Sequence, residues 1–194
     1  MPCAHAVNLS DERDYRWRVE ELPITGIVIP VAEADRFVQS ASGGPRRLPG
    51  FGTVPAHITL LAPFLPEEEL DDATWEALGA FFDDVTPFGF ELTDVCEFPG
   101  GVTYLSPEPA GTFRRLTQEL HKLFPEFPPY GGAFDEIVPH LTVPLAEGEN
   151  MAALTTALTP GLPLAVHASA AAVFVTDEDG TRVLGTLPFG NSAA

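Results

Sequence analysis

The sequence predicts an α+β fold in which helices pack outside a mainly antiparallel sheet. The first observation behind this prediction is the order of the apolar patterns, which is β-α-β-α-β-β-α-β-α-β-β. The second is that short Pro- and Gly-rich segments separate these patterns, and none of them resembles a linker between independent domains. The third is a His-x-Thr motif that occurs twice in similar surroundings. We therefore expect a single domain over residues 1–194, built from an internal repeat.

Two short segments carry the repeated motif, His57-Ile58-Thr59-Leu60 and His140-Leu141-Thr142-Val143. Both follow a Val-Pro step and lie in β-branched and apolar runs, which favour strands. Side chains at positions i and i+2 of a strand point to the same face, so His57 shares a face with Thr59, and His140 with Thr142. If the duplication places the two strands side by side, two imidazoles and two hydroxyls surround one small hole.

The first half of the chain supplies the elements around the first motif. Residues 25–29 are predicted to form a buried strand that ends at a proline, and residues 31–40 have the apolar spacing of a helix. A Gly- and Pro-rich loop over 42–50 precedes the motif strand, 57–64. Pro66 and the three glutamates after it favour the start of a helix that runs to about residue 84.

The second half begins with a predicted β-hairpin, residues 88–97 and 102–105, joined by a Pro-Gly-Gly turn. An amphipathic helix over 109–124 is expected to direct its apolar residues inward, namely Phe113, Leu116, Leu120 and Leu123. A loop over 125–134 leads into the second motif. A short helix, 149–158, and two strands, 164–176 with a break and 182–187, complete the predicted fold.

Composition and charge limit the classes of function. The chain has 194 residues and a formal net charge of −18, and so acidic a surface repels a long polyanion such as RNA. No run reaches the roughly 20 apolar residues of a membrane span, and the N-terminus lacks the pattern of a secretory signal. Because Cys3 and Cys96 are the only cysteines, a reducing cytoplasm is the expected location.

The paired histidines indicate acid and base catalysis. Imidazole has an unperturbed pKa close to neutrality, so one member of a facing pair can accept a proton while the other donates one. Cleavage of a phosphodiester needs both transfers. In this scheme His57 and His140 move the protons, and Thr59 and Thr142 hold the phosphoryl oxygens by hydrogen bonds. The scheme requires no metal and no cofactor.

Two other interpretations of the motif are open. A single His-x-Thr in a strand is commonly ordinary sheet sequence, and the doubled motif is a structural repeat on this interpretation. A zinc site built on the two histidines is the second, although no third ligand follows at a typical spacing. The remaining histidines, His5, His121 and His167, have no such neighbours and are interpreted as surface or structural residues.

The doubled motif and its flanking residues resemble the two-histidine phosphoesterase superfamily, in particular its bacterial 2'-5' RNA ligase-like branch. The similar segments are Pro-Ala-His-Ile-Thr-Leu-Leu-Ala-Pro-Phe-Leu-Pro in the first half and Tyr-Gly-Gly-Ala-Phe-Asp-Glu-Ile-Val-Pro ahead of the second motif. The resemblance covers roughly residues 24–187. It implies a bilobal, pseudo-two-fold fold of two interleaved lobes with a central cleft. It also implies metal-independent hydrolysis of 2',3'-cyclic or related phosphodiesters, with His57, Thr59, His140 and Thr142 as the site.

The chain departs from several members of this superfamily, which place a basic residue soon after the motif, where this chain has apolar residues and proline. Arg46 and Arg47 are the candidate phosphate clamp in their place, with a solvated loop pair as the alternative. Arg114 and Arg115 are expected on the solvated face of a helix. Three aromatic residues are candidates for stacking a nucleobase or for ordinary packing, namely Phe127, Tyr130 and Phe134.

These observations lead to three hypotheses. The first is a monomeric cyclic phosphodiesterase that acts on a small nucleotide or a terminal ribose phosphate. The second is a binding module that holds a nucleotide or phosphate ester without turnover, and the matched proton-transfer groups count against it. The third is end-joining by a 2'-5' RNA ligase, which an acidic surface supports poorly. The local sequences do not assign acid and base between the two histidines.

Overall fold

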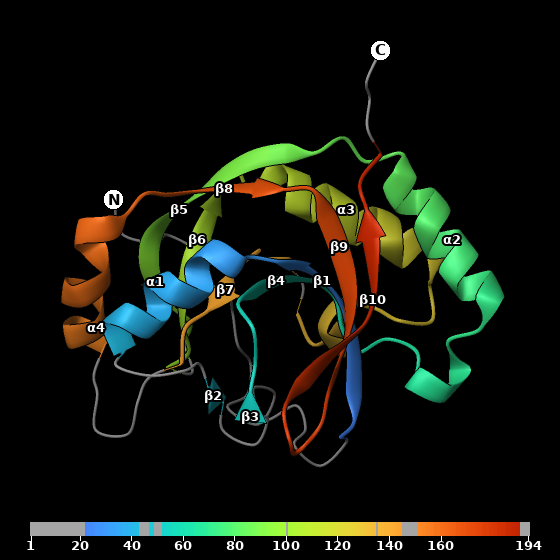
Figure 1. Cartoon of the computed structure of the whole chain (residues 1–194), viewed down its shortest axis with the longest axis horizontal. Helices are drawn as coiled ribbons and strands as arrows, with labels where there is room; N and C mark the ends of the chain where they lie inside the picture. Colours follow the sequence, from blue (N-terminus) through green and yellow to red (C-terminus); the bar gives the residue numbers. More distant parts are fainter. Residues whose placement is uncertain are drawn as a thin grey trace.

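The computed structural model describes residues 22–42, 47–48, 52–99, 101–134, 136–144 and 151–190, with the backbone alone for 40–42, 47–48 and 52–53. Within these residues the fold is α+β, with two four-stranded antiparallel sheets and helices packed around them (Figure 1). The predicted fold class is therefore confirmed. No helix of the described residues is long and apolar enough to cross a membrane.

The first sheet joins the two ends of the chain. Its strands are β1 (Ile24–Pro30), β4 (His57–Leu61), β9 (Ala170–Thr176) and β10 (Thr181–Pro188), in the order β10-β9-β1-β4. Val28 of β1 pairs with Thr59 on one side and with Ala172 on the other. The first motif strand, β4, is consequently an edge strand.

The second sheet is built from the middle of the chain. Its strands are β5 (Phe88–Glu97), β6 (Thr103–Glu108), β7 (Leu141–Thr142) and β8 (Leu164–Ala168), in the order β7-β6-β5-β8. Thr142 pairs with Tyr104 of β6, and the Val143 amide donates to the Thr103 carbonyl at 2.8 Å. The second motif strand, β7, is also an edge strand.

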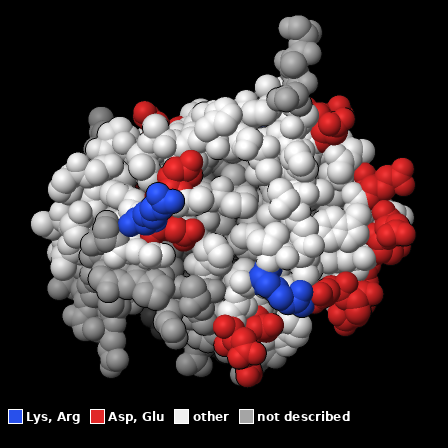
Figure 2. All heavy atoms as spheres, viewed as in Figure 1, with Lys and Arg blue, Asp and Glu red and all other residues white. Residues whose placement is uncertain are grey.

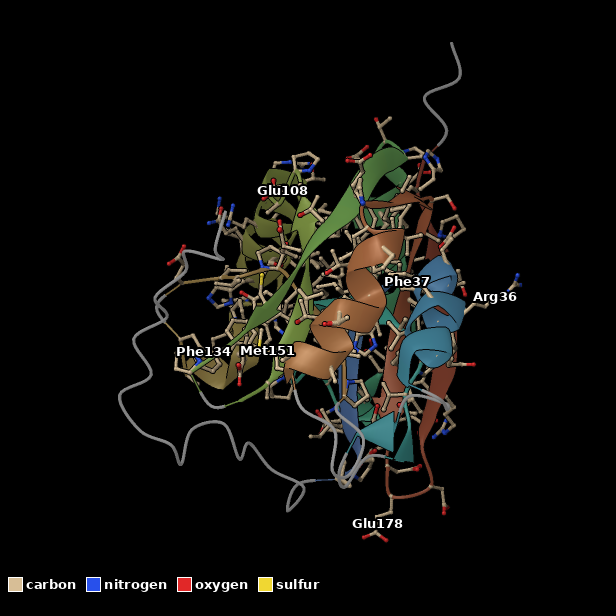
Figure 3. All side chains as sticks on the ribbon, turned by 90° about the vertical axis from the view of Figure 1, so that its left-hand side faces the viewer. Arg36, Phe37, Glu108, Phe134, Met151 and Glu178 are labelled. Carbon is tan, nitrogen blue, oxygen red and sulfur yellow. The ribbon has the colours of Figure 1, made fainter. Side chains whose placement is uncertain are left out.

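The helices cover the outer sides of the sheets. The α-helices are α1 (Ala32–Ser42), α2 (Asp72–Asp83), α3 (Gly111–Leu123) and α4 (Met151–Leu158). Short 3-10 helices are η3 (Glu67–Glu69), η4 (Pro129–Gly132) and η5 (Thr159–Gly161), and β2 (Arg47–Leu48) pairs with β3 (Gly52–Thr53). Helix α1 packs on α4 with Phe37 between them (Figure 3), α2 packs on β10, and α3 packs on β4.

The repeat expected from the sequence is visible in the order and pairing of the elements. In the first lobe β1 leads through α1 to β4, and β4 pairs with β1. In the second lobe β6 leads through α3 to β7, and β7 pairs with β6. The two edge strands β4 and β7 contact each other (Figure 1). The duplication therefore brings both motifs to the junction of the two sheets.

The motif strands are anchored from behind by the main core. Ile58 and Leu60 of β4 are buried in it, as are Leu141 and Val143 of the second motif. His57 and Thr59 alternate with these residues and are only half-buried, and His140 and Thr142 do the same. The alternation places each His-Thr pair on one face of its strand, as the i, i+2 spacing predicts.

Several boundaries differ from the prediction. The helix expected from Pro66 begins instead at Asp72, because the Asp71 carboxylate accepts from the Thr74 amide at 2.8 Å and caps it, while the glutamates form η3. The second hairpin strand continues to Glu108. Leu123, expected to point inward, is 43% exposed, because it is the last residue of α3 and extends past the core.

The packing behind β4 yields a first prediction. Ile58 is fully buried, so Ile58→Ala should lower the free energy of unfolding by about 2 to 5 kcal/mol through lost burial and a residual cavity. Urea denaturation measures this change. Leu123→Ala, which removes an exposed side chain of similar size, is the matched control and should cost well under half as much. Equal losses in the two variants would contradict the assignment of Ile58 to the core.

Candidate active site

His57 is oriented by a hydrogen bond within its own strand. Its Nδ1 atom lies 2.7 Å from the carbonyl oxygen of Pro55, two residues earlier. A carbonyl oxygen can only accept, so Nδ1 carries the hydrogen in this bond. In the neutral ring the lone pair is therefore on Nε2, at the opposite side of the imidazole from the strand that holds it.

His140 is oriented in the same way. Its Nδ1 atom lies 2.8 Å from the carbonyl oxygen of Val138, again two residues earlier. Both imidazoles thus have the same fixed tautomer when neutral, with the basic lone pair on Nε2. The i−2 bond is local, so a His preceded by an extended Val-Pro segment makes it in each copy of the repeat.

The two lobes give their histidines different surroundings. The His57 ring meets Phe174 of β9 edge-on at a centroid distance of 5.6 Å. The His140 ring meets three aromatic rings, namely Phe98 at 4.9 Å, Tyr104 at 5.6 Å and Tyr130 at 6.0 Å. Desolvation of the ring within the protein lowers the pKa of His140 below its usual range, against the smaller opposing effect of the Val138 hydrogen bond. His140 is therefore biased toward the neutral form.

Each lobe also provides a small apolar cluster separate from the main core. In the first lobe the cluster consists of Val28, Ala172 and Phe174, and Val28 pairs directly with Thr59. In the second lobe it contains Phe98 and Tyr104, and Tyr104 pairs with Thr142. Burial raises the pKa of the Tyr104 phenol, so that hydroxyl stays protonated. Both polar pairs thus lie beside apolar surface, where hydrogen bonds to a bound anion are stronger than in water.

Tyr130 of η4 stands out for its backbone. At φ 54° and ψ 34° it is the one residue other than glycine with positive φ in the described part of the chain. Two glycines of positive φ follow it, and they allow the tight turn. Its ring stacks on His140 with an interplanar angle of 22° and meets Phe134 edge-on at 5.8 Å. Of the sequence-predicted pair, Tyr130 therefore lies beside a motif histidine, and Phe134 lies beside Tyr130.

The other predicted binding residues divide into two groups. Arg46 lies outside the described residues, and Arg47 is described only by its backbone in β2. Their assignment as a phosphate clamp stays a prediction. Phe127 is half-buried and packs against Phe64 at 5.3 Å beside the main core, which agrees with the ordinary-packing alternative for this residue. Arg115 is exposed and paired with Glu119, in agreement with a solvated face.

Two charged helix residues hold the motifs, and one of them, Arg114, was expected on a solvated face. Asp35 of α1 accepts from the Ala56 amide at 2.7 Å, immediately before His57. Arg114 of α3 donates from Nε to the Ile137 carbonyl at 3.2 Å, shortly before His140. Each is the fourth residue of its helix, and α1 and α3 are equivalent in the repeat. Their equal positions in the two repeated helices are the sequence feature that could have indicated equivalent roles for Asp35 and Arg114.

Within the residues that the structure describes, no three His, Cys, Asp or Glu side chains gather as metal ligands. The arrangement that remains is a pair of imidazoles with fixed tautomers, each next to a threonine on the same strand face. Such a pair can move two protons at one reacting group.

Comparison with known proteins places this geometry in a family. A family model described as the 2'-5' RNA ligase superfamily matches residues 30–180, which is well over half of the chain and includes both motifs. The chain belongs to the 2'-5' RNA ligase superfamily. This membership also places it among the two-histidine phosphoesterases that the sequence motifs resemble.

Solved structures share the fold of this superfamily member at low identity. The crystal structure of TT0787 from Thermus thermophilus is 21% identical with a TM-score of 0.58, and the match covers 87% of this chain and 99% of that one. Escherichia coli LigT in complex with 3'-AMP is 16% identical with a TM-score of 0.54, over 88% of this chain and all of LigT. LigT in complex with NADP+ is 17% identical with a TM-score of 0.54, and the match covers 89% of this chain and 100% of LigT. No curated protein matches the chain.

The pKa of His140 leads to a prediction about stability. The folded state resists protonation of this ring, whereas the unfolded chain binds the proton at the ordinary value of 6.5. This contribution to stability is fully present above that value and is lost as pH falls below it. The wild type should therefore lose more stability than His140→Gln between about pH 8 and pH 5. Urea denaturation across this range measures the difference, and parallel profiles would contradict the burial of a neutral ring.

Proposed function

We propose that this protein is a metal-independent phosphodiesterase that hydrolyses 2',3'-cyclic or related small ribose phosphodiesters. The observation that carries the proposal is the matched hydrogen bonding of His57 and His140. Each imidazole is held through Nδ1 on an edge strand, and the two strands are neighbours. Membership of the superfamily makes a phosphoesterase activity the expected one. Binding alone has no need of two proton-transfer groups fixed in the same tautomer.

The reaction follows from this arrangement. The Nε2 atom of the neutral histidine takes a proton from water as the water oxygen bonds to phosphorus. The bond from phosphorus to one ribose oxygen breaks, and the protonated histidine gives its Nε2 proton to that oxygen. Thr59 and Thr142 hydroxyls donate to the phosphoryl oxygens, where negative charge increases in the transition state. The protonation states of the two histidines exchange in one turnover, and solvent restores them.

Charge supports a small substrate. The net charge is −18, and Figure 2 shows acidic side chains gathered along the side of the molecule formed by η3 and α2. Such a surface disfavours a long polyanion but does not exclude a compact ligand with one or two phosphates. The LigT structures were solved with 3'-AMP, ATP and NADP+, all small nucleotides. We include a monomeric state and a cytoplasmic location, both suggested by the sequence, in the proposal.

Tyr130 and Phe134 are the proposed nucleobase platform. They meet edge-on, and Tyr130 lies against His140, so a base stacked on them places its ribose phosphate near the catalytic pair. Tyr130 is held there by a backbone conformation that is unfavourable for a non-glycine residue. Such conformations persist where surrounding structure fixes them, and they concentrate at functional sites.

The platform is tested by substitution of Tyr130. Stacking is worth about 1 to 3 kcal/mol per base, so Tyr130→Ala should raise KM for a cyclic nucleotide by roughly 5- to 100-fold. Tyr130→Phe keeps the ring and should stay near the wild-type value. A cyclic ribose phosphate without a base is the matched substrate, and its KM should not depend on the ring. Equal effects on both substrates would refute base stacking.

The catalytic pair is tested by hydrolysis of 2',3'-cyclic mononucleotides in EDTA. Turnover should survive the chelator, and His57→Ala and His140→Ala should each lower kcat by about 100-fold or more, the usual effect of losing a general acid or base. His167→Ala, on β8, is the control and should leave the rate unchanged.

Three other outcomes would replace the proposal. Loss of turnover in EDTA would indicate a metal-dependent reaction. Binding of nucleotides without turnover of any cyclic phosphate would favour the binding-module hypothesis. Joining of RNA ends without hydrolysis would instead favour a ligase.

A further inference from the structure

The two copies of the motif differ at the residue before the histidine. In the first copy this residue is Ala56, which has a backbone N–H, and in the second it is Pro139, which has none. The difference is chemically important because the peptide unit involved is the one whose carbonyl holds the histidine. The Pro55 carbonyl carbon is bonded to the Ala56 nitrogen, and the Val138 carbonyl carbon is bonded to the Pro139 nitrogen.

In the first lobe both ends of this peptide unit are hydrogen-bonded. The Pro55 carbonyl accepts from His57 Nδ1 at 2.7 Å, and the Ala56 N–H donates to the Asp35 carboxylate, also at 2.7 Å. Asp35, the Pro55–Ala56 peptide and His57 thus form a continuous chain of two short hydrogen bonds. Ala56 is 1% exposed, and its carbonyl also accepts from the Val31 amide at 2.8 Å. The peptide nitrogen in the middle of the chain is therefore buried and tied to α1, while Asp35 and His57 at its two ends are half-buried.

A carboxylate at one end of such a chain acts on the imidazole at the other. It draws the amide hydrogen toward itself and increases the negative charge on the carbonyl oxygen, because hydrogen bonds in a chain polarise one another. The more negative carbonyl stabilises the imidazolium. A carboxylate bonded directly to Nδ1 has the same effect in catalytic triads, where it orients the ring and stabilises its charged form. Here one peptide unit lies between the two groups.

The second lobe cannot form this chain. Pro139 has no N–H to donate to a carboxylate. No hydrogen bond at the peptide nitrogen can therefore polarise the Val138 carbonyl. The residue equivalent to Asp35 is Arg114, and it donates to the Ile137 carbonyl, one peptide unit earlier. His140 also contacts three aromatic rings, which remove part of its hydration and so disfavour a positive charge on it.

We propose that Asp35 is a positioning residue that acts through the Pro55–Ala56 peptide to favour the protonated form of His57 over that of His140. This inference rests on the proposed phosphodiesterase function for the assignment of catalytic roles. The bias that Asp35 exerts on His57 is independent of any substrate. His140 takes the proton from water, and His57 protonates the departing ribose oxygen.

The other titratable groups near the two rings come from a few elements. Strands β1 and β9 carry no titratable residue, and Arg36, next to Asp35 in sequence, points away into solvent (Figure 3). Arg115 pairs with Glu119 on the exposed side of α3, and Arg114 is bonded to the backbone. The remaining elements packed against β4 and β7 carry the following titratable or charged residues: Tyr104, Glu108, Arg114, Arg115, Glu119, His121, Lys122 and Tyr130.

The test is an NMR titration of the imidazole signals without substrate, with the signals assigned from His57→Gln and His140→Gln. In the wild type His57 should become protonated at a higher pH than His140. Asp35→Asn keeps an oxygen that accepts from Ala56 but removes the charge. It should lower the pH at which His57 is half-protonated by about half a unit. A carboxylate in direct contact produces a larger shift, of roughly one to three units. The titration of His140 should not move.

Kinetics give the second measurement. The general acid sets the basic limb of the pH profile of kcat/KM, so Asp35→Asn should shift that limb to lower pH and cost about threefold in rate above it. The acidic limb, set by His140, should stay in place. Glu33→Gln, which removes an exposed carboxylate from the first turn of the same helix, is the control and should change neither limb.

The outcomes separate the two proposals. A wild type in which His57 titrates at or below His140 would overturn the inference. So would an Asp35→Asn variant that loses stability but keeps the wild-type titration, because Asp35 would then be merely structural. If no cyclic phosphate is turned over, the proposed function fails, and the titration still decides whether Asp35 biases His57.

Discussion

The contact between the edge strands β4 and β7 is the constraint on which the rest of this structure depends. Each strand belongs to a different sheet, and each pairs on one side only within the described residues. The apolar residues of both strands enter one core, which fixes the opposite, polar faces relative to each other. Because a strand alternates its side chains, burial of Ile58 and Leu141 is what presents His57 and His140 at the junction.

The two copies of the repeat share their topology but differ in the chemistry of the residues that support the histidines. The order of elements, the strand pairing and the i−2 hydrogen bonds of the histidines agree between the lobes. The fourth residues of α1 and α3 hold equivalent segments, yet one is an acid that accepts and the other a base that donates. Acid and base catalysis needs one protonated and one neutral group at the same pH, and a difference in proton affinity fixes which group is which. A strictly symmetric duplication would offer two equal imidazoles, and the differences at Asp35 and Pro139 remove that equality.

Much of the fold followed from local patterns. The strands and helices, the break near residue 169 and the shared face of each His-Thr pair are consequences of apolar period and of Pro and Gly placement. The errors lie where a single tertiary contact decides. Leu123 is at the end of its helix, so its apolar spacing does not bring it to the core. Where the local pattern left two alternatives open, in the aromatic loop, the contacts decide: Phe127 packs against the core and Tyr130 stacks on His140.

The sequence by itself determined the α+β class, the duplication and the four motif residues. These features depend on the period of apolar residues and on two similar segments that can be compared directly in the sequence. Only the tertiary structure decided which charged residues reach the motifs. Asp35 and Arg114 look like solvated helix residues in sequence, and they meet Ala56 and Ile137 only after α1 and α3 pack on their lobes. A contact between segments more than 20 residues apart depends on the packing of whole elements, and no local pattern encodes it.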